Sequence, residues 1–200
     1  KKFIFASSQM SNMDFSPYGT LKRLGEDLTQ SLNCLYVKFW NVYGIEKEIE
    51  KSHVITDFVR MAINKKKINM LTNGNESREF LYADDCSRGL FKIMVNFNFF
   101  VKKKKELHLT TAKKIKIIQI AKIIKKILLK KNIKIEIRPS NKKDNLQNNV
   151  NNLSNNFFLK YWKPEIKIDQ GIEKIIRYYQ KSKNKFEYFL IKFFVIFFIE

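Results

Sequence analysis

The sequence has 200 residues, 44% hydrophobic and 14% aromatic, which suffices for a folded core and argues against a disordered chain. Its net charge of +20 is uneven, because residues 1–100 carry 14 Lys/Arg against 11 Asp/Glu whereas residues 101–200 carry 25 against 8. Most of the excess is Lys, and Arg, the better ligand for bases and phosphates, occurs only six times, so we expect no nucleic-acid role.

The two cysteines, Cys34 and Cys86, and the two histidines show no metal-ligand spacing and no disulfide framework. We therefore expect no metal site and a reducing, cytoplasmic setting. Residues 3–6 already read as a buried strand, so we expect the sequence to begin in the middle of a fold.

Residues 17–33 predict an amphipathic helix, with Ser16 as N-cap and Pro17 at the first helical position. Its apolar stripe consists of Leu21, Leu24, Leu28 and Leu32. The remaining pattern alternates strand and helix, which indicates an α/β fold. Strands are expected at 35–40, 68–71, 80–82, 106–109 and 133–137, and helices at 54–65, 84–95, 113–130 and 169–180.

Three details complete the expected organisation. Thr110 or Thr111 is the expected cap of the helix at 113–130, and residues 141–156 are Asn-rich and loop-like. Residues 184–200 form an aromatic tail whose longest apolar run, 193–199, is too short to span a bilayer. We interpret this tail either as an interfacial membrane contact or as an aberrant end.

Tyr18 and Lys22 are the first candidates for chemistry. On a helix, positions i and i+4 share a face, and an ammonium beside a phenol favours the phenolate that proton abstraction needs. The pattern alone is weak, because a Tyr is followed by a Lys at this spacing four times in the chain. Only Tyr18 follows Ser-Pro, opens an amphipathic helix and comes just after a strand that ends in two serines.

Three segments together resemble the extended short-chain dehydrogenases/reductases, in particular their NAD-dependent nucleotide-sugar epimerases and dehydratases. They are residues 5–26 (Phe-Ala-Ser-Ser, then Ser-Pro-Tyr-Gly-Thr-Leu-Lys and Glu26), residues 37–44 (Val-Lys-Phe-Trp-Asn-Val-Tyr-Gly) and residues 78–85 (Arg-Glu-Phe-Leu-Tyr-Ala-Asp-Asp). Weaker similarity continues to about residue 180. The segments occur in the family's order, which makes them informative as a set.

The resemblance implies roles for individual residues. Tyr18 matches the catalytic tyrosine, Lys22 its partner that also holds the NAD ribose, and Ser8 the catalytic serine, with Ser7 as runner-up. Phe39 and Trp40 match positions near the nicotinamide. The implied substrate contacts are Asn41 and Arg78 at the diphosphate, Arg138 and Asp144 near the nucleotide, and His53 close to the sugar, although His53 also fits a structural role.

The two residues directly after Ser8 limit the range of reactions that the resemblance implies. Relatives that dehydrate carry an Asp-Glu pair there and decarboxylases a Glu, whereas this sequence has Gln9 and Met10, which do no acid/base work at neutral pH. The resemblance therefore favours a 4-epimerase, with a dehydratase or reductase as the alternative. Two departures stand out: Lys38 replaces the family's Arg, and the six glycines never form the Gly-rich turn that binds the NAD pyrophosphate.

We expect the C-terminal half of a Rossmann-like parallel sheet with a small α/β substrate-binding subdomain, and weak or no NAD binding by this chain alone. Residues 1–66 would complete the cofactor domain, residues 67–183 the substrate-binding part with interleaved Rossmann elements, and 184–200 the tail. A nucleotide sugar is the expected substrate, and a homodimer the expected assembly of the full-length protein. The other readings are a non-catalytic remnant and a Lys-rich binder of nucleic acid or membrane surfaces.

Overall fold

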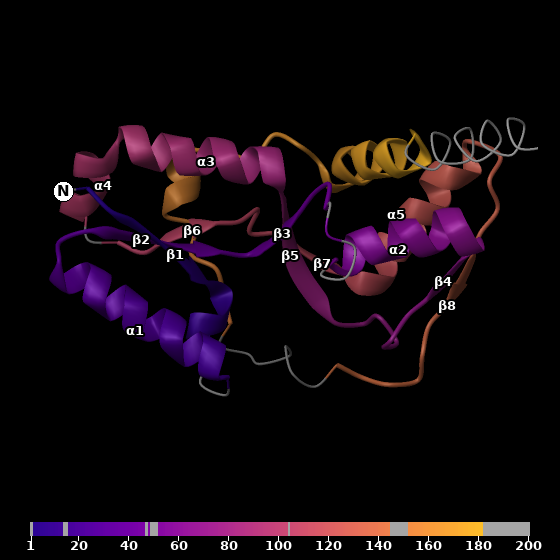
Figure 1. Cartoon of the computed structure of the whole chain (residues 1–200), viewed down its shortest axis with the longest axis horizontal. Coiled ribbons are helices and arrows are strands. Elements are labelled where there is room, and N and C mark those ends of the chain that lie inside the picture. Colours follow the sequence, from indigo (N-terminus) through magenta and orange to yellow (C-terminus); the bar gives the residue numbers. More distant parts are fainter. Residues whose placement is uncertain are drawn as a thin grey trace, which may run out of the picture.

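The computed structural model describes residues 2–13, 16–46, 48, 52–103, 105–144 and 152–181. The predicted α/β class is confirmed, and Figure 1 shows the elements in two groups along the long axis. The aromatic tail at 184–200 lies outside the described residues. In the part of the chain that the structure describes, no helix combines the length and apolar character that crossing a bilayer requires.

The first group is built on a parallel sheet of β1 (Ile4–Ser8), β2 (Leu35–Phe39) and β6 (Leu107–Leu109), in the order β1-β2-β6. Ser8 at the end of β1 lies opposite Phe39 at the end of β2. Helix α1 (Pro17–Ser31) covers one face of this sheet, and α3 (Ala83–Val95) with α4 (Phe97–Lys103) covers the other (Figure 1). The short 3₁₀ helices η1 (Gln9–Asn12) and η3 (Phe158–Lys160) also belong here.

The second group contains α2 (Val54–Lys65), α5 (Ile117–Leu129) and a helix over residues 168–181. Its parallel pair is β4 (Lys67–Asn69) with β8 (Glu136–Arg138). A third sheet joins the groups: β3 (Asn41–Tyr43) runs parallel to β5 (Ser77–Tyr82), which pairs antiparallel with β7 (Lys114–Lys116). The chain thus passes directly from β2 into β3, from one group to the other.

Each group has its own hydrophobic core. One core gathers β2, α3, α4, β6 and η3 around side chains such as Val37, Ile93 and Phe158. The other gathers α2, α5 and the helix at 168–181 around side chains such as Ile55 and Ile120. Helix α2 belongs to this second core, although the predicted boundary at residue 66 would assign it to the first part; the division at 66/67 stays a prediction.

One expectation about helices needs correction. The helix expected from residue 113 begins at Ile117, because Lys114–Lys116 pair with β5 instead, and neither Thr110 nor Thr111 caps it. The cap is Lys116, whose backbone N–H donates to the Gln119 side chain at 3.0 Å. In α1, the predicted leucine stripe is 54–69% exposed and faces away from the sheet.

Candidate active site

Helix α1 starts where the sequence predicts, and its first turn places Tyr18 and Lys22. Ser16 Oγ accepts from the Gly19 N–H at 2.9 Å, and Pro17 occupies the first position. Gly19 packs so tightly that a Cβ there would lie 2.3 Å from the Met10 carbonyl oxygen. This contact presses the start of α1 onto η1, directly after the end of β1.

Lys22 reaches back across this start of the helix. Its Nζ donates to the Ala6 carbonyl oxygen at 2.6 Å and lies 5.5 Å from the centroid of the Tyr18 ring. Tyr18 is 54% exposed, and among the described residues its hydroxyl makes no hydrogen bond to Lys22 or Ser8. The structure therefore brings the ammonium against the ring face and pairs the hydroxyl with neither Lys22 nor Ser8.

The two serines at the end of β1 face different surroundings. Ser8 is half-buried, and its Oγ accepts from the Met10 N–H at 3.2 Å as the cap of η1. Ser7 is buried and donates to Glu26 of α1. The Ser7 hydroxyl is thus used within the protein interior, whereas Ser8 remains partly exposed at the end of β1.

A buried polar network lies beneath this surface, and its extent is not apparent from the sequence. Lys38, only 4% exposed, lies 3.2 Å from Glu26 Oε2, 3.1 Å from Glu106 Oε1 and 2.7 Å from Asn12 Oδ1. Lys38 occupies the position at which the resembled family has Arg. Its partners Glu26, Glu106 and Asn12 therefore all contact a single ammonium group. The local sequence signals are Glu26 in the first resembling segment and a lysine inside an otherwise apolar strand.

The same network continues through Glu106 to Trp40. Hydrogen bonds from His108 and Lys38 hold the pKa of Glu106 at about 2. His108 Nδ1 accepts from the Trp40 indole at 3.2 Å and from the Asn155 N–H at 3.1 Å, so the proton of this ring sits on Nε2, facing Glu106. Trp40 is consequently buried and turned into the protein, whereas Phe39 is half-buried at the end of β2.

Asn41 uses its side chain to join three elements. Its Oδ1 accepts from Gln9 Nε2 at 3.2 Å, and its Nδ2 donates to the Glu79 carbonyl oxygen at 2.9 Å. Gln9, the residue after Ser8, is thus hydrogen-bonded to Asn41 and buried. The amide pair fixes η1 against β3 beside the end of β1.

A cavity of about 610 Å³ lies in the second group, between α2, β4 and the start of β5. Arg78 lines it, and Arg78 Nη2 donates to Asp144 Oδ2 at 3.1 Å. The wall combines apolar with polar side chains. It comprises Val54, Asp57, Phe58, Arg60, Met61, Asn64, Lys65, Asn69, Met70, Leu71, Thr72, Glu76, Arg78 and Ile117.

Two further predicted contacts, Arg138 and His53, adjoin lining residues but do not line the cavity themselves. Arg138 pairs with Glu136 at 2.6 Å, and both side chains are more than half exposed. The His53 side chain is 71% exposed and pairs with Glu46. The structure therefore brings Arg78 and Asp144 together, whereas Arg138 and His53 are engaged with Glu136 and Glu46.

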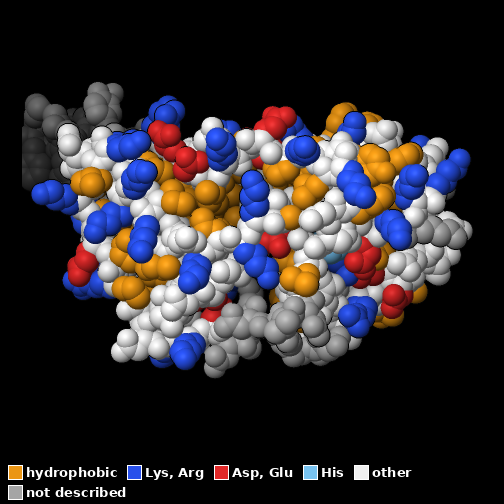
Figure 2. All heavy atoms as spheres, turned by 180° about the vertical axis from the view of Figure 1, so that it is seen from behind, with side chains coloured by type: hydrophobic (Ala, Val, Ile, Leu, Met, Phe, Trp, Pro, Cys, Tyr) orange, Lys and Arg blue, Asp and Glu red, His pale blue; other side chains and the backbone are white. Residues whose placement is uncertain are grey.

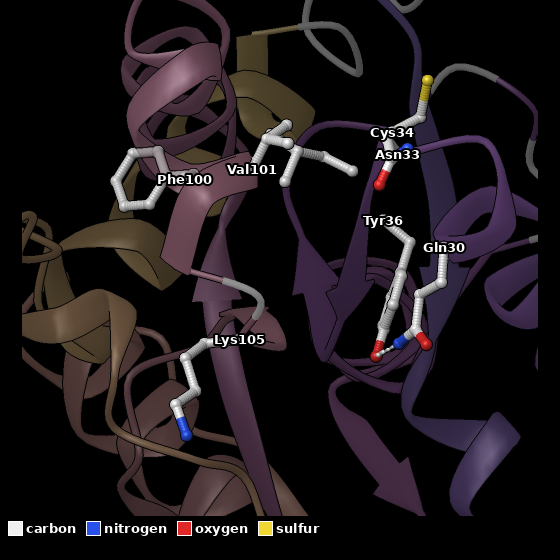
Figure 3. Close-up of a pocket in the computed structure, with 8 residues that line it drawn as sticks. Gln30, Asn33, Cys34, Tyr36, Phe100, Val101 and Lys105 are labelled. Carbon is white, nitrogen blue, oxygen red and sulfur yellow. Dashed lines mark hydrogen bonds between the residues drawn. The ribbon is translucent and has the colours of Figure 1, made fainter.

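A second cavity, of about 250 Å³, lies at the other end of β2 from Phe39 (Figure 3). Tyr36 and Gln30 meet there, with Gln30 Nε2 donating to the Tyr36 hydroxyl at 3.1 Å. Burial, with Glu106 nearby, raises the pKa of Tyr36. None of the predicted site residues lines this cavity.

The basic side chains do not gather in one place on the face drawn in Figure 2, where Lys and Arg are scattered between hydrophobic and acidic ones. Several basic side chains of the protein form ion pairs, for example Lys174 with Asp84 and Arg177 with Glu173. Among the described residues, no group of three or more His, Cys, Asp or Glu could hold a metal ion.

Comparison with known proteins decides the family. Residues 3–105, just over half of the chain, match the sequence profile of the NAD dependent epimerase/dehydratase family. The chain belongs to this family. The resemblance seen in its three segments is thereby confirmed.

Individual members of the epimerase/dehydratase family match over much of the chain. It is 26% identical over 174 residues to a UDP-glucuronate 4-epimerase of Thermodesulfobacterium geofontis, covering 84% of this chain and 51% of that protein. It is 22% identical over 145 residues to UDP-glucuronic acid decarboxylase 1 of Danio rerio, covering 72% of this chain and 33% of that protein.

The fold agrees with a solved member, the epimerase Mth375 from Methanothermobacter thermautotrophicus. The TM-score is 0.73 at 19% identity, and the match covers 92% of this chain and 60% of the other. The chain spans about half the length of the curated epimerases it matches.

Proposed function

We propose that this chain carries the catalytic residues and part of the substrate site of an NAD-dependent nucleotide-sugar 4-epimerase. The observation that carries the proposal is the Lys22 ammonium, 5.5 Å from the Tyr18 ring centroid on the first turn of α1, beside the end of β1. Ends of parallel strands are where α/β enzymes of this architecture bind dinucleotides and substrates.

In this proposal Tyr18, Lys22 and Ser8 handle the proton. Tyr18 Oη takes the proton of the sugar hydroxyl, and the Lys22 charge favours the phenolate that accepts it. Ser8 Oγ, half-buried at the end of β1, donates to the reacting sugar oxygen. When bound, NAD supplies the hydride acceptor and later the donor.

The chain's residues fit one end of that cofactor. The exposed Tyr18 hydroxyl and the Lys22 ammonium are donors suited to ribose hydroxyls, and Phe39 is the half-buried residue at the end of β2. Trp40 follows Phe39 in the chain, and its hydrogen bond to His108 holds its side chain inside the protein. The sequence contains no clustered glycines for a pyrophosphate turn, so these residues concern the nicotinamide and ribose only.

We place the nucleotide diphosphate at Arg78. Its guanidinium lines a cavity of a volume common for ligand sites, and Asp144 orients it from the facing segment. Asn41 remains a candidate substrate contact between Tyr18 and Arg78, although its side-chain amide already forms hydrogen bonds with Gln9 and Glu79. Arg138 and His53 would have to leave their pairing partners to contribute.

Epimerisation is favoured because neither side chain after Ser8 can act as a second acid or base. Gln9 is neutral and hydrogen-bonded to Asn41, and Met10 is apolar. An epimerase needs no such group, since the keto sugar turns over between two hydride transfers. A dehydratase or reductase is the alternative within the family, and the decarboxylase relative shows that other outcomes occur on this scaffold.

The exposed stripe of α1 supports the proposed homodimer. Leu21, Leu24, Leu28 and Leu32 lie on one side of the helix, and each is more than half exposed. A continuous apolar face of this kind marks an interaction surface. Sedimentation of the intact protein should give a dimer, and Leu24→Lys with Leu28→Lys should give a monomer.

The proposal is tested by incubating the intact protein with NAD and a panel of UDP-, dTDP- and GDP-sugars, with products identified by NMR. A 4-epimer establishes the epimerase, whereas a 4-keto-6-deoxy sugar or a reduced sugar selects a dehydratase or reductase. Absence of any product across the panel, with the protein folded, contradicts the proposal and favours a remnant. Polyanion binding that falls steeply with salt would instead support the Lys-rich binder.

A further inference from the structure

Two buried polar atoms at the wall of the 610 Å³ cavity have no hydrogen-bond partner. Within the described residues, the buried side-chain atoms without a hydrogen-bond partner are the Glu76 oxygen Oε2 and the Arg78 nitrogen Nε. Glu76 is only 6% exposed, and both residues line the cavity. Buried polar groups are nearly always paired, so an acceptor and a donor left open at one wall call for an explanation.

The two residues lie on the same side of the chain. Arg78 is the second residue of β5 and Glu76 immediately precedes the strand, so they are two positions apart, the spacing at which side chains share a face. One offers a carboxylate oxygen that can only accept, and the other an N–H that can only donate. A ligand that satisfies both must carry a donor and an acceptor.

The carboxylate of Glu76 is held in place. Thr72 Oγ1 donates to its Oε1 at 2.5 Å, which leaves the buried Oε2 as the unpaired atom. The turn from Thr72 to Glu76 is itself anchored, because the Gly74 N–H donates to Thr72 Oγ1 at 3.2 Å and the Ile117 N–H donates to the Glu76 carbonyl oxygen at 3.0 Å.

Gly74 allows this turn to lie against α5. It has φ of +76°, and a Cβ there would lie 2.9 Å from the Ile118 backbone nitrogen. Glu76 therefore has little freedom to swing into solvent. A carboxylate fixed with one oxygen satisfied and one open is arranged for a partner that comes from outside the chain.

A purely structural role explains these contacts poorly. Bonding to Thr72 needs one acceptor oxygen, which a neutral glutamine would supply without burying a charge. The arrangement is costly to the empty protein and becomes favourable only when a donor reaches Oε2.

We propose that Glu76 is a specificity-determining residue, whose Oε2 accepts a hydrogen bond from an N–H or O–H donor of the bound nucleotide. The inference rests on the proposed function, in which Arg78 holds an anionic oxygen of the same ligand. The donor is either the N–H edge of the base or a ribose hydroxyl. Both present a hydrogen to a fixed carboxylate, and a ligand lacking that hydrogen leaves Oε2 unpaired.

Calorimetry on the intact protein tests this, first with UDP, CDP, GDP and ADP. The tightest binder is then compared with its base N-methyl, 2′-deoxy and 3′-deoxy analogues, in the wild type and in Glu76→Gln. Glu165→Gln, the same change at an exposed carboxylate outside the cavity, is the control. A lost charged hydrogen bond corresponds to about a tenfold to hundredfold weaker affinity.

We expect one analogue to bind the wild type at least about tenfold more weakly than its parent, and that penalty to vanish in Glu76→Gln. The analogue concerned identifies base or ribose as the source of the donor. An equal penalty in both proteins, or a Glu76→Gln variant that binds the parent like the wild type, overturns the inference.

Two further readouts separate the possible failures. Without ligand, Glu76→Gln should melt no lower than the wild type, whereas a carboxylate that only supports the fold would lower the melting temperature when replaced. Nucleotide binding that Arg78→Gln abolishes and Glu76→Gln leaves intact removes Glu76 and keeps the proposed function. A wild type that binds no nucleoside diphosphate contradicts both.

Discussion

Replacing Lys38 by Met should destabilise the protein strongly, because Lys38 is the ammonium shared by Glu26 and Glu106. The distances are 3.2 and 3.1 Å, and the Lys38 and Glu26 side chains are almost fully buried. Removing one partner of a buried ion pair costs about 3–5 kcal/mol, since the remaining charge stays desolvated. With total stabilities of roughly 5–15 kcal/mol, the loss should be plain.

The assay is urea unfolding of the intact protein, followed by tryptophan fluorescence, to which Trp40 in the same network contributes. Adding Glu26→Gln to Lys38→Met should recover part of the loss, because it removes the buried charge left behind. Lys174→Met is the matched control: Lys174 pairs with Asp84 at the surface, so its loss should stay under about 1 kcal/mol. A loss as small for Lys38→Met as for the control would refute the reasoning.

Two other changes test the surroundings of the site. Gly19→Ala should separate α1 from η1, since its Cβ would meet the Met10 carbonyl oxygen at 2.3 Å; we expect a stability loss of about 1–3 kcal/mol in urea unfolding, and unchanged stability would contradict the contact. Glu106→Gln should alter acid unfolding. The pKa of Glu106 is lowered from 4.5 to about 2 in the folded protein, so its stabilisation is present above pH 4.5 and is lost as pH falls towards 2. The stability difference between wild type and variant should therefore shrink over that window, and a difference independent of pH would be the contrary result.

Local sequence signals predict the elements that position the site. The Ser16 cap and Pro17 mark the start of α1 correctly, and α2 spans the expected residues. These features depend on neighbours in the chain. The start of α5 differs from the prediction because Lys114–Lys116 pair with residues 77–79, a contact that no local pattern encodes.

Side-chain environments are harder to predict, because they depend on residues distant in sequence. Lys38 looks like a surface lysine and is buried only because Glu26 and Glu106 reach it from two other elements. The leucine stripe of α1 indicates the helix, yet the residues that face the sheet are small or polar, such as Gly25, which packs against Phe5 of β1, and Glu26. The resemblance places Arg78 at the diphosphate and Asp144 near the nucleotide, and the structure pairs the two side chains across 66 residues.

Turnover by Tyr18→Phe is the most direct test of the proposed chemistry. The variant lacks only the phenolic oxygen, so we expect product formation from the preferred nucleotide sugar to fall by at least about 10²-fold while nucleotide binding at Arg78 is retained. Tyr161→Phe, an equally conservative change at a partly exposed tyrosine in a cluster of aromatic rings, should turn over like the wild type. Undiminished turnover by Tyr18→Phe would show that the proton leaves the sugar by another route.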